Sequence, residues 1–206
     1  HLTGGAVITV KNLGLDADLL WQHVQNEKAT LATIVGDAFA RPMLEALDRS
    51  KKDGSPYDLS SLKIILSSGV MWSQEVKEGL LNHHDMMLVD AMGSSEGNMG
   101  IAIAARGVPP KTASFQANED VKVFDDNDQE VAAGSEQIGM VATPSAMRGY
   151  YKDPEKTEKT VRVIGGVRWV FPGDYAKLES DGSMTLLGRG SMCINTAGEK
   201  VFPEEV

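Results

Sequence analysis

Cysteine is almost absent from the 206-residue chain, since Cys193 is the only one. A single thiol can form neither an internal disulfide nor a cysteine-based zinc site, which favours a reducing compartment, and we expect a cytoplasmic protein. The chain also lacks any run of about 18 uncharged apolar residues, so the sequence predicts no integral membrane association. With 42% hydrophobic and 24% charged residues, the composition is that of a globular protein with a real core.

Basic residues are too few for a nucleic-acid surface. Lys and Arg number 20 against 29 Asp and Glu, which gives a formal net charge of −9. A phosphate-tracking surface needs a basic stripe, and none is visible, so the sequence predicts no nucleic-acid partner. The acidic residues gather at 119–120 and 125–130. Their spacing does not match an EF-hand, and we interpret them as solvated turns.

The two ends of the sequence are abrupt. His1 is preceded by no Met, basic leader or cleavage signal, and the chain stops shortly after Phe202 and Pro203, where a helix would begin. We therefore expect a piece of a larger protein.

Two patterns divide the chain at about residue 110. Before it, predicted strands at 5–10, 29–35, 62–67 and 86–90 alternate with helices at 16–28, 37–49 and from Ser73, the expected N-cap, onward. Alternation of this kind indicates parallel βαβ units, in which ligands gather at the carboxyl ends of strands.

After residue 110 the helical periodicity nearly disappears. Short predicted strands at 121–124, 138–143, 168–171, 175–179 and 184–187 are separated by Asp, Asn and Gly turns. One helix interrupts them where Asp153 is followed by Pro154, a cap and a first helical residue. The second half therefore reads as a small antiparallel β unit.

Small polar residues follow two of the predicted strands, at 67–73 and at 90–97. Glycines allow a close backbone approach, Ser94 and Ser95 can donate to oxyanions, and Glu96 can hold the hard cation that accompanies a polyphosphate. A simple Gly/Ser turn with a structural glutamate would explain the second segment equally well. Further along the chain, Asp174 could accept two ribose hydroxyls and Arg189 could bind a phosphate, although a turn aspartate and a surface arginine are simpler interpretations.

The order of these segments resembles the adenylate-forming (AMP-binding, ANL superfamily) acyl-CoA synthetases, or fatty-acid–CoA ligases. The resemblance rests on Ser68–Met71, Met92–Glu96, Gly149–Thr157, Pro172–Asp174, and Gly188–Arg189 through Gly198–Glu205. It implies an α/β plus β fold like that of acetyl-CoA synthetase. We expect a partial α/β subdomain at 1–110, a small distorted antiparallel β-barrel subdomain at 111–187, and a hinge with the start of a C-terminal domain at 188–206. The chain would be an internal fragment of the large N-terminal domain.

The resemblance also implies a reaction for the parent protein. ATP and a small-molecule carboxylate would give acyl-AMP, and coenzyme A would then displace AMP, with Mg²⁺ as cofactor. The oligomeric state is left open, and a homodimer is one possibility. The family's upstream phosphate loop and its downstream adenylation lysine are missing from the sequence. We therefore assign no catalytic residue here and expect the fragment itself to be inactive.

Site residues carry over by position. The nucleotide would contact Gly69, Val70, Met71, Asp90, Met92, Gly93, Ser95, Asp174 and Arg189, and Glu96 would ligate the metal. The acyl pocket would include Val35, Gly36, Phe39, Ser67, Ser68, Asn98, Met99 and Gly100, and the hinge would be Gly190, Ser191 and Met192. Met92 departs from the tyrosine that many members stack on adenine, Ser95 from a threonine, and Met192 from a hinge Asp or Lys.

Other functions stay open at this point. Within the same chemistry these are a fatty-acyl-AMP ligase that loads a carrier protein and a CoA ligase for an aryl or steroid-side-chain carboxylate. A noncatalytic nucleotide-binding module is an alternative from another class. A dinucleotide-dependent oxidoreductase is disfavoured because no Gly-x-Gly-x-x-Gly follows a first strand.

Overall fold

The computed structural model of the chain describes residues 4–11, 14–190, 194–196 and 199–201. These residues form two compact units, which the chain enters alternately. The first unit contains the described residues up to 90 together with 103–112, and the second contains 91–102 and the described residues from 113 onward.

The first unit is the predicted α/β part. Its elements are α1 (Ala17–Asn26), β1 (Leu31–Ile34), α2 (Gly36–Lys52), β2 (Ile64–Ser68), α3 (Gln74–His83) and the first half of β3 (Met87–Ser94). β1 and β2 are parallel, with Leu31 opposite Ile64 and Ile34 opposite Ser67, so β1–α2–β2 is the βαβ unit that the alternation predicted. β3 lies next to β2.

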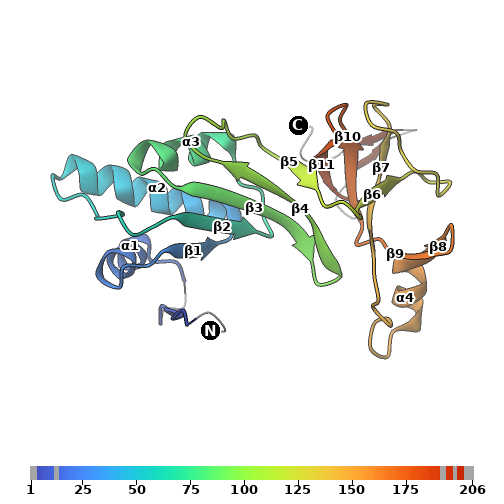
Figure 1. Cartoon of the computed structure of the whole chain (residues 1–206), viewed down its shortest axis with the longest axis horizontal. Helices are drawn as coiled ribbons and strands as arrows, with labels where there is room; N and C mark the ends of the chain where they lie inside the picture. Colours follow the sequence, from blue (N-terminus) through green and yellow to red (C-terminus); the bar gives the residue numbers. More distant parts are fainter. Residues whose placement is uncertain (1–3, 12–13, 191–193, 197–198, 202–206) are drawn as a thin grey trace. The chain divides into compact units, whose positions relative to one another are not determined.

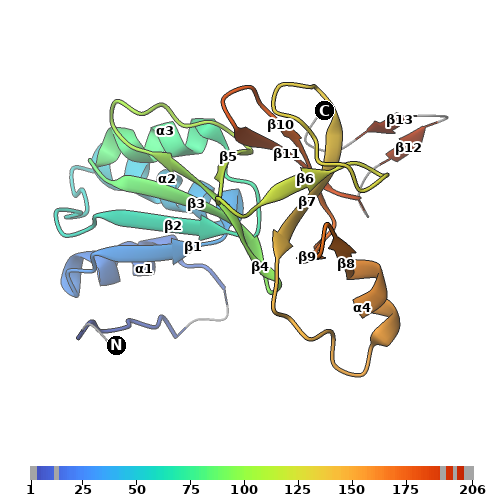
Figure 2. The ribbon, with the colours of Figure 1, turned by 45° about the vertical axis from the view of Figure 1, so that its right-hand side comes forward.

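The three helices of this unit pack side by side, with α2 between α1 and α3 (Figures 1 and 2). Asp16 begins α1, because its carboxylate accepts the Leu19 N–H at 3.0 Å. On α2, the apolar stripe of Ala40, Met43 and Leu47 recurs at helical spacing and is buried. The helices thereby close one hydrophobic core over the strands.

The second unit is antiparallel. Its strands are the tip of the β3–β4 hairpin (β4, Gly97–Ala104), β5 (Ser114–Ala117), β6 (Lys122–Phe124), β7 (Ile138–Pro144), β8 (Val161–Ile164), β9 (Val167–Val170), β10 (Asp174–Leu178), β11 (Ser183–Arg189), β12 (Ile194–Thr196) and β13 (Glu199–Val201). The strand order is β4-β5-β11-β10-β7-β9-β8, with β6 also on β7, so the described strands form an open path. β12 and β13 pair with each other.

Among the described residues of this unit one α-helix, α4 (Pro154–Thr160), leads directly into the β8–β9 hairpin (Figure 2). Asp153 caps it as predicted, since its carboxylate accepts the Lys156 N–H at 2.9 Å. Two small apolar clusters hold the strands, one around Met99, Phe115 and Met184 and the other around Phe124 and Trp169.

The structure corrects three local predictions. Residues 5–10, expected as a strand, are exposed and form neither strand nor helix. α2 continues to Lys52 rather than ending at Arg49. Ser73 occupies the N-cap position of α3, but its side chain makes no capping bond.

Candidate functional site

The loop after β2 is fixed against the start of α2 in the first unit. Gly36 has a φ of +47°, and a Cβ there would lie 2.5 Å from the carbonyl oxygens of Val70 and Met71. The Asp37 N–H donates to the Met71 carbonyl at 3.0 Å, and the Asp37 carboxylate accepts the Ser73 N–H at 2.9 Å. The Asp37 carboxylate therefore holds the N-terminus of α3 through the N–H of Ser73, without replacing the side-chain cap that Ser73 lacks.

Two apolar side chains of this loop are exposed to solvent. Val70 is 51% and Met71 48% exposed. Apolar side chains on a rigid backbone can cover one face of a flat ring at little entropic cost. Gly69, with a φ of +91°, has open space around its Cβ position, so the backbone there is accessible.

The predicted acyl-pocket residues of this unit divide into two groups. Ser67 is buried, and its hydroxyl accepts the Gly36 N–H at 2.9 Å. This hydrogen bond joins the end of β2 to the start of α2, so both residues have a structural role. Val35 is exposed, and Phe39 lines a cavity of about 370 Å³ together with Leu20 and Thr33. Ser68 ends β2 and is half-buried.

Asp90 forms a buried ion pair rather than an open ligand group. Lys77 Nζ lies 3.0 Å from Asp90 Oδ2 and also donates to the Lys111 carbonyl at 3.2 Å. The ammonium group lies 5.4 Å from the centroid of the Trp72 ring. Burial raises the pKa of Asp90, and the Lys77 charge opposes that rise. A nucleotide contact was predicted for Asp90, and in the structure its carboxylate pairs with Lys77.

Residues 90–97 are a hairpin and not the predicted loop. β3 continues to Ser94, β4 starts at Gly97, and only Ser95 and Glu96 form the turn. Because side chains alternate along a strand, Met92 points into the core of the second unit, where it is 6% exposed, and Gly93 is exposed. Met92 is therefore covered by protein, whereas Ser95 is exposed at the turn.

The predicted acyl-pocket residues of β4 also make contacts within the second unit. Met99 is fully buried in the same core, and a Cβ at Gly100 would lie 2.6 Å from the Gln116 carbonyl on β5. Asn98 is exposed, and its carbonyl accepts the Asn118 side-chain N–H at 2.9 Å.

Glu96 carries the carboxylate of the turn. Its Oε1 accepts a hydrogen bond from the Tyr150 hydroxyl at 2.5 Å. That bond, followed by one from Ser94, lowers the pKa of Glu96, while the same contact raises the pKa of Tyr150. Glu96 is thus held as a carboxylate at the tip of a hairpin.

Glu96 was predicted to hold Mg²⁺, and its surroundings fit that ion. Among the described residues no cluster of three or more His, Cys, Asp or Glu side chains could hold a metal by itself. Mg²⁺ does not need such a cage, because it commonly binds one or two carboxylates, several waters and the phosphates of a substrate. An ionised glutamate beside exposed Ser95 meets that requirement.

Asp174 and Arg189 face each other on neighbouring strands of the second unit. They are register partners on β10 and β11, and Arg189 Nε lies 3.3 Å from Asp174 Oδ1. The Asp174 side chain is 12% exposed and the Arg189 side chain 55%. Burial raises the pKa of Asp174, opposed by Arg189. An almost covered carboxylate with a partner at the surface can accept hydrogen bonds from vicinal hydroxyls.

A family profile described as AMP-binding enzyme matches residues 1–151. The chain belongs to the AMP-binding enzyme family. This AMP-binding chain is 44% identical over 195 residues to 3-oxocholest-4-en-26-oate–CoA ligase of Rhodococcus rhodochrous, covering 91% of the chain and 35% of the relative. It is 41% identical over 207 residues to medium/long-chain-fatty-acid–CoA/3-oxocholest-4-en-26-oate–CoA ligase of Mycolicibacterium smegmatis, covering 98% of the chain and 37% of the relative. The chain thus spans about a third of the length of these relatives.

Solved structures share the fold of this AMP-binding chain. The amide bond synthetase McbA of Marinactinospora thermotolerans matches with a TM-score of 0.73 and 22% identity, covering 93% of this chain and 38% of that one. The anthranilate CoA ligase AuaEII in complex with anthranoyl-AMP matches with a TM-score of 0.73 and 23% identity, covering 92% and 35%. The mixed α/β and β fold predicted from the sequence is confirmed.

The remaining predictions concern the hinge and the membrane. Gly190 follows β11, and a Cβ there would lie 2.6 Å from the Tyr175 ring; Ser191 and Met192 lie outside the described residues. Within the described ranges no helix is long and apolar enough to cross a membrane. Sequence reasoning missed Lys77, Asp37 and Tyr150, whose partners are distant in sequence. Gly149–Thr157 was recognised as a motif, but without a role.

Proposed function

We propose that this chain is the nucleotide-contacting part of an AMP-forming acid–CoA ligase. The observation that carries the proposal is the 44% identity, over 91% of the chain, to a relative named as a CoA ligase. In the proposed reaction a carboxylate oxygen attacks the α-phosphorus of ATP, the α–β phosphoanhydride breaks, and pyrophosphate leaves. The thiol of coenzyme A then attacks the acyl carbon, the acyl–oxygen bond breaks, AMP leaves, and the thiol proton passes to solvent.

The names of the relatives suggest the acid. They act on 3-oxocholest-4-en-26-oate and on medium- or long-chain fatty acids. We propose that the substrate is a large apolar carboxylate of this kind. A steroid side-chain acid and a fatty acid are equally good candidates for it. Exposed Val35 and the cavity beside Phe39 are the described apolar surfaces of the first unit that support this choice.

The second unit supplies the polar contacts in this proposal. Asp174 would accept the ribose hydroxyls while Arg189 holds its carboxylate in place, and Ser95 would donate to the α-phosphate. Val70 and Met71 of the first unit would cover the adenine. Attack on the α-phosphorus increases negative charge on its oxygens, and a donor such as the Ser95 hydroxyl would stabilise that charge.

Mg²⁺ belongs to the proposal as the ion that Glu96 would hold. When bound, it would supply positive charge to the phosphate oxygens. The contribution of the chain is to keep Glu96 ionised at the tip of the hairpin, in line with its lowered pKa. We further propose the cytoplasm as the compartment, on the ground of the single cysteine.

Calorimetric titration with AMP tests the proposal. The wild-type chain should bind AMP, and Asp174→Asn should weaken binding about tenfold, the typical effect of losing one charged hydrogen bond. Asp85→Asn serves as the control, since Asp85 is an exposed aspartate in the first unit, and should leave the affinity unchanged. Binding that ignores Asp174, or no binding at all, would favour a scaffold of this fold without a nucleotide site.

A further inference from the structure

The segment Gly149–Thr157 has no role in the reaction proposed above, although it is one of the motifs that carry the family resemblance. The structure connects it directly to the hairpin tip. The Tyr150 hydroxyl donates to Glu96 Oε1 at 2.5 Å, across 54 residues of sequence. Both residues belong to the second unit, so the contact lies within one compact body.

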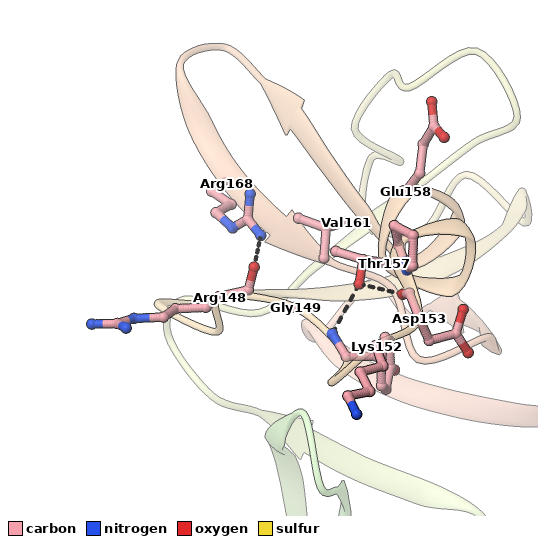
Figure 3. Close-up of a pocket in the computed structure, with 10 residues that line it drawn as sticks. Arg148, Gly149, Lys152, Asp153, Thr157, Glu158, Val161 and Arg168 are labelled. Carbon is pink, nitrogen blue, oxygen red and sulfur yellow. Dashed lines mark hydrogen bonds between the residues drawn. The ribbon is translucent and has the colours of Figure 1, made fainter.

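The backbone of Tyr150 is anchored by α4. Its N–H donates to Thr157 Oγ1 at 2.8 Å, and the Thr157 hydroxyl donates to the Asp153 carbonyl at 2.8 Å. Figure 3 shows Thr157 at the centre of these two bonds, facing Asp153. Gly149 has a φ of +147°, and a Cβ there would lie 2.8 Å from Thr157, which explains the glycine. The motif therefore builds a support for one tyrosine.

The ring of Tyr150 is fixed as well. Lys156 Nζ lies 4.0 Å from its centroid, a cation–π contact that comes from the first turn of α4. The neighbouring Tyr151 is 87% exposed. Of two consecutive tyrosines, one is held toward Glu96 and the other is left in solvent.

We propose that Tyr150 is a positioning residue for Glu96. By engaging Oε1, the anchored hydroxyl fixes the orientation of the carboxylate at the two-residue turn and leaves Oε2 for the Mg²⁺ that accompanies a nucleotide. A free glutamate would lose rotational freedom on binding the ion, whereas a pre-oriented one has already lost it. Groups that hydrogen-bond to a metal ligand commonly change metal affinity by about 10- to 100-fold when removed. This inference rests on the proposed function.

The first measurement needs neither metal nor nucleotide. Thermal unfolding of wild type, Tyr150→Phe, Glu96→Ala and the double variant forms a double-mutant cycle. Tyr150→Phe keeps the ring and its Lys156 contact, and Tyr151→Phe is the matched control. The double variant should lower the midpoint by less than the sum of the single variants, and Tyr151→Phe should not change it. Additive shifts would show that the hydroxyl and the carboxylate are not coupled, which overturns the inference.

The second measurement follows Mn²⁺–ATP binding by the enhancement of water-proton relaxation. Tyr150→Phe should raise the half-saturating protein concentration about tenfold, Glu96→Ala should abolish the enhancement, and Tyr151→Phe should match wild type. If Glu96→Ala weakens binding but Tyr150→Phe does not, the tyrosine is only structural: the inference falls and the proposed function stands. If wild type gives no enhancement, the proposed metal role of Glu96 fails, and the inference fails with it.

Discussion

The two units of this AMP-binding chain each contain a covered aspartate paired with a cation, but the cations differ. Lys77, the partner of Asp90 in the first unit, has a side chain that is 3% exposed, whereas Arg189, the partner of Asp174 in the second, is 55% exposed. Burial raises the pKa of both aspartates, and the partner cation opposes the rise in each. The same pairing therefore serves structure in one unit and leaves a partner accessible to ligands in the other.

The position along the strand explains the difference. Asp90 lies in the middle of β3, and Lys77 reaches it from α3 while also binding the Lys111 carbonyl. Asp174 is the first residue of β10, and Arg189 is the last of β11. A pair at strand ends can exchange its partner for a ligand, because the cation is already in water.

The largest expected effect comes from removing the buried cation. Lys77→Met leaves Asp90 covered and unpaired, and we expect a loss of about 3–5 kcal/mol in the free energy of unfolding, measured in urea. Arg189→Met should cost less than Lys77→Met, because Arg189 is 55% exposed and water can replace much of its contact with Asp174. Similar losses for the two variants would contradict the comparison.

The double variant Lys77→Met/Asp90→Leu is the control for this prediction. Replacing both charges by apolar side chains removes the unpaired carboxylate, so most of the lost stability should return. A double variant as unstable as Lys77→Met would mean that the Lys111 contact, rather than the ion pair, carries the effect.

An intermediate effect tests the rigidity of the first unit at Gly36. Gly36→Ala would place a methyl group 2.5 Å from two carbonyl oxygens of the 69–71 loop, and we expect about 2–3 kcal/mol of destabilisation. Gly54→Ala is the matched control, because Gly54 also has a positive φ, +75°, but nothing lies within 4 Å of its Cβ position. It should cost about 1 kcal/mol, the conformational part alone. Thermal or urea unfolding of the two variants separates the steric contribution from the conformational one. Equal losses of stability in Gly36→Ala and Gly54→Ala would refute the steric contribution.

The smallest expected effects are changes of the free energy of unfolding with pH. Two carboxylates of the second unit, Asp174 and Glu96, should change it in opposite directions. The folded pKa of Asp174 is raised, so its contribution to stability is present below its unfolded pKa, about 3.9, and is lost as the pH rises through the folded pKa. Wild type should therefore lose stability relative to Asp174→Asn on going from acidic toward neutral pH. The folded pKa of Glu96 is lowered, so its contribution is present above the unfolded pKa, about 4.3, and is lost as the pH falls.

Wild type should correspondingly gain stability relative to Glu96→Gln as the pH rises through that range. Urea unfolding between about pH 3 and 7 measures both differences, each bounded at about 1.4 kcal/mol per pH unit because one proton is exchanged. Slopes of the same sign for the two variants would mean that the Tyr150 bond does not favour the ionised glutamate.

The local patterns in the sequence predicted most of the elements. Helices α1 to α4 and strands β1, β2, β7 and β10 lie where periodicity and capping residues placed them. The β3–β4 hairpin was missed because Gly and Ser dominate residues 93–97, which is typical of a loop. The strand conformation there depends on the pairing of β3 with β4, and β4 in turn pairs with β5, where Gly100 lies opposite Ala117.

The candidate site was predictable in type but not in its contacts. Glu96 and Asp174 became candidates through the order of the motifs and the family resemblance, because a turn residue explains each of them alone equally well or better. Lys77 looks like a residue of a polar helix face, and nothing near it in sequence shows that Asp90 lies 3.0 Å away. The supports of a site are long-range contacts, and a single sequence does not display them.

The alternating path of the chain between the units bears on biosynthesis. All described residues of the first unit have been translated once residue 112 is made, so its core can close early. The hairpin tip at 91–102 must then wait for β5 and, through it, for β11 at Ser183–Arg189 before its sheet is complete. At ordinary translation rates of about 5–20 residues per second, Glu96 is synthesised several seconds before the sheet that carries it can finish.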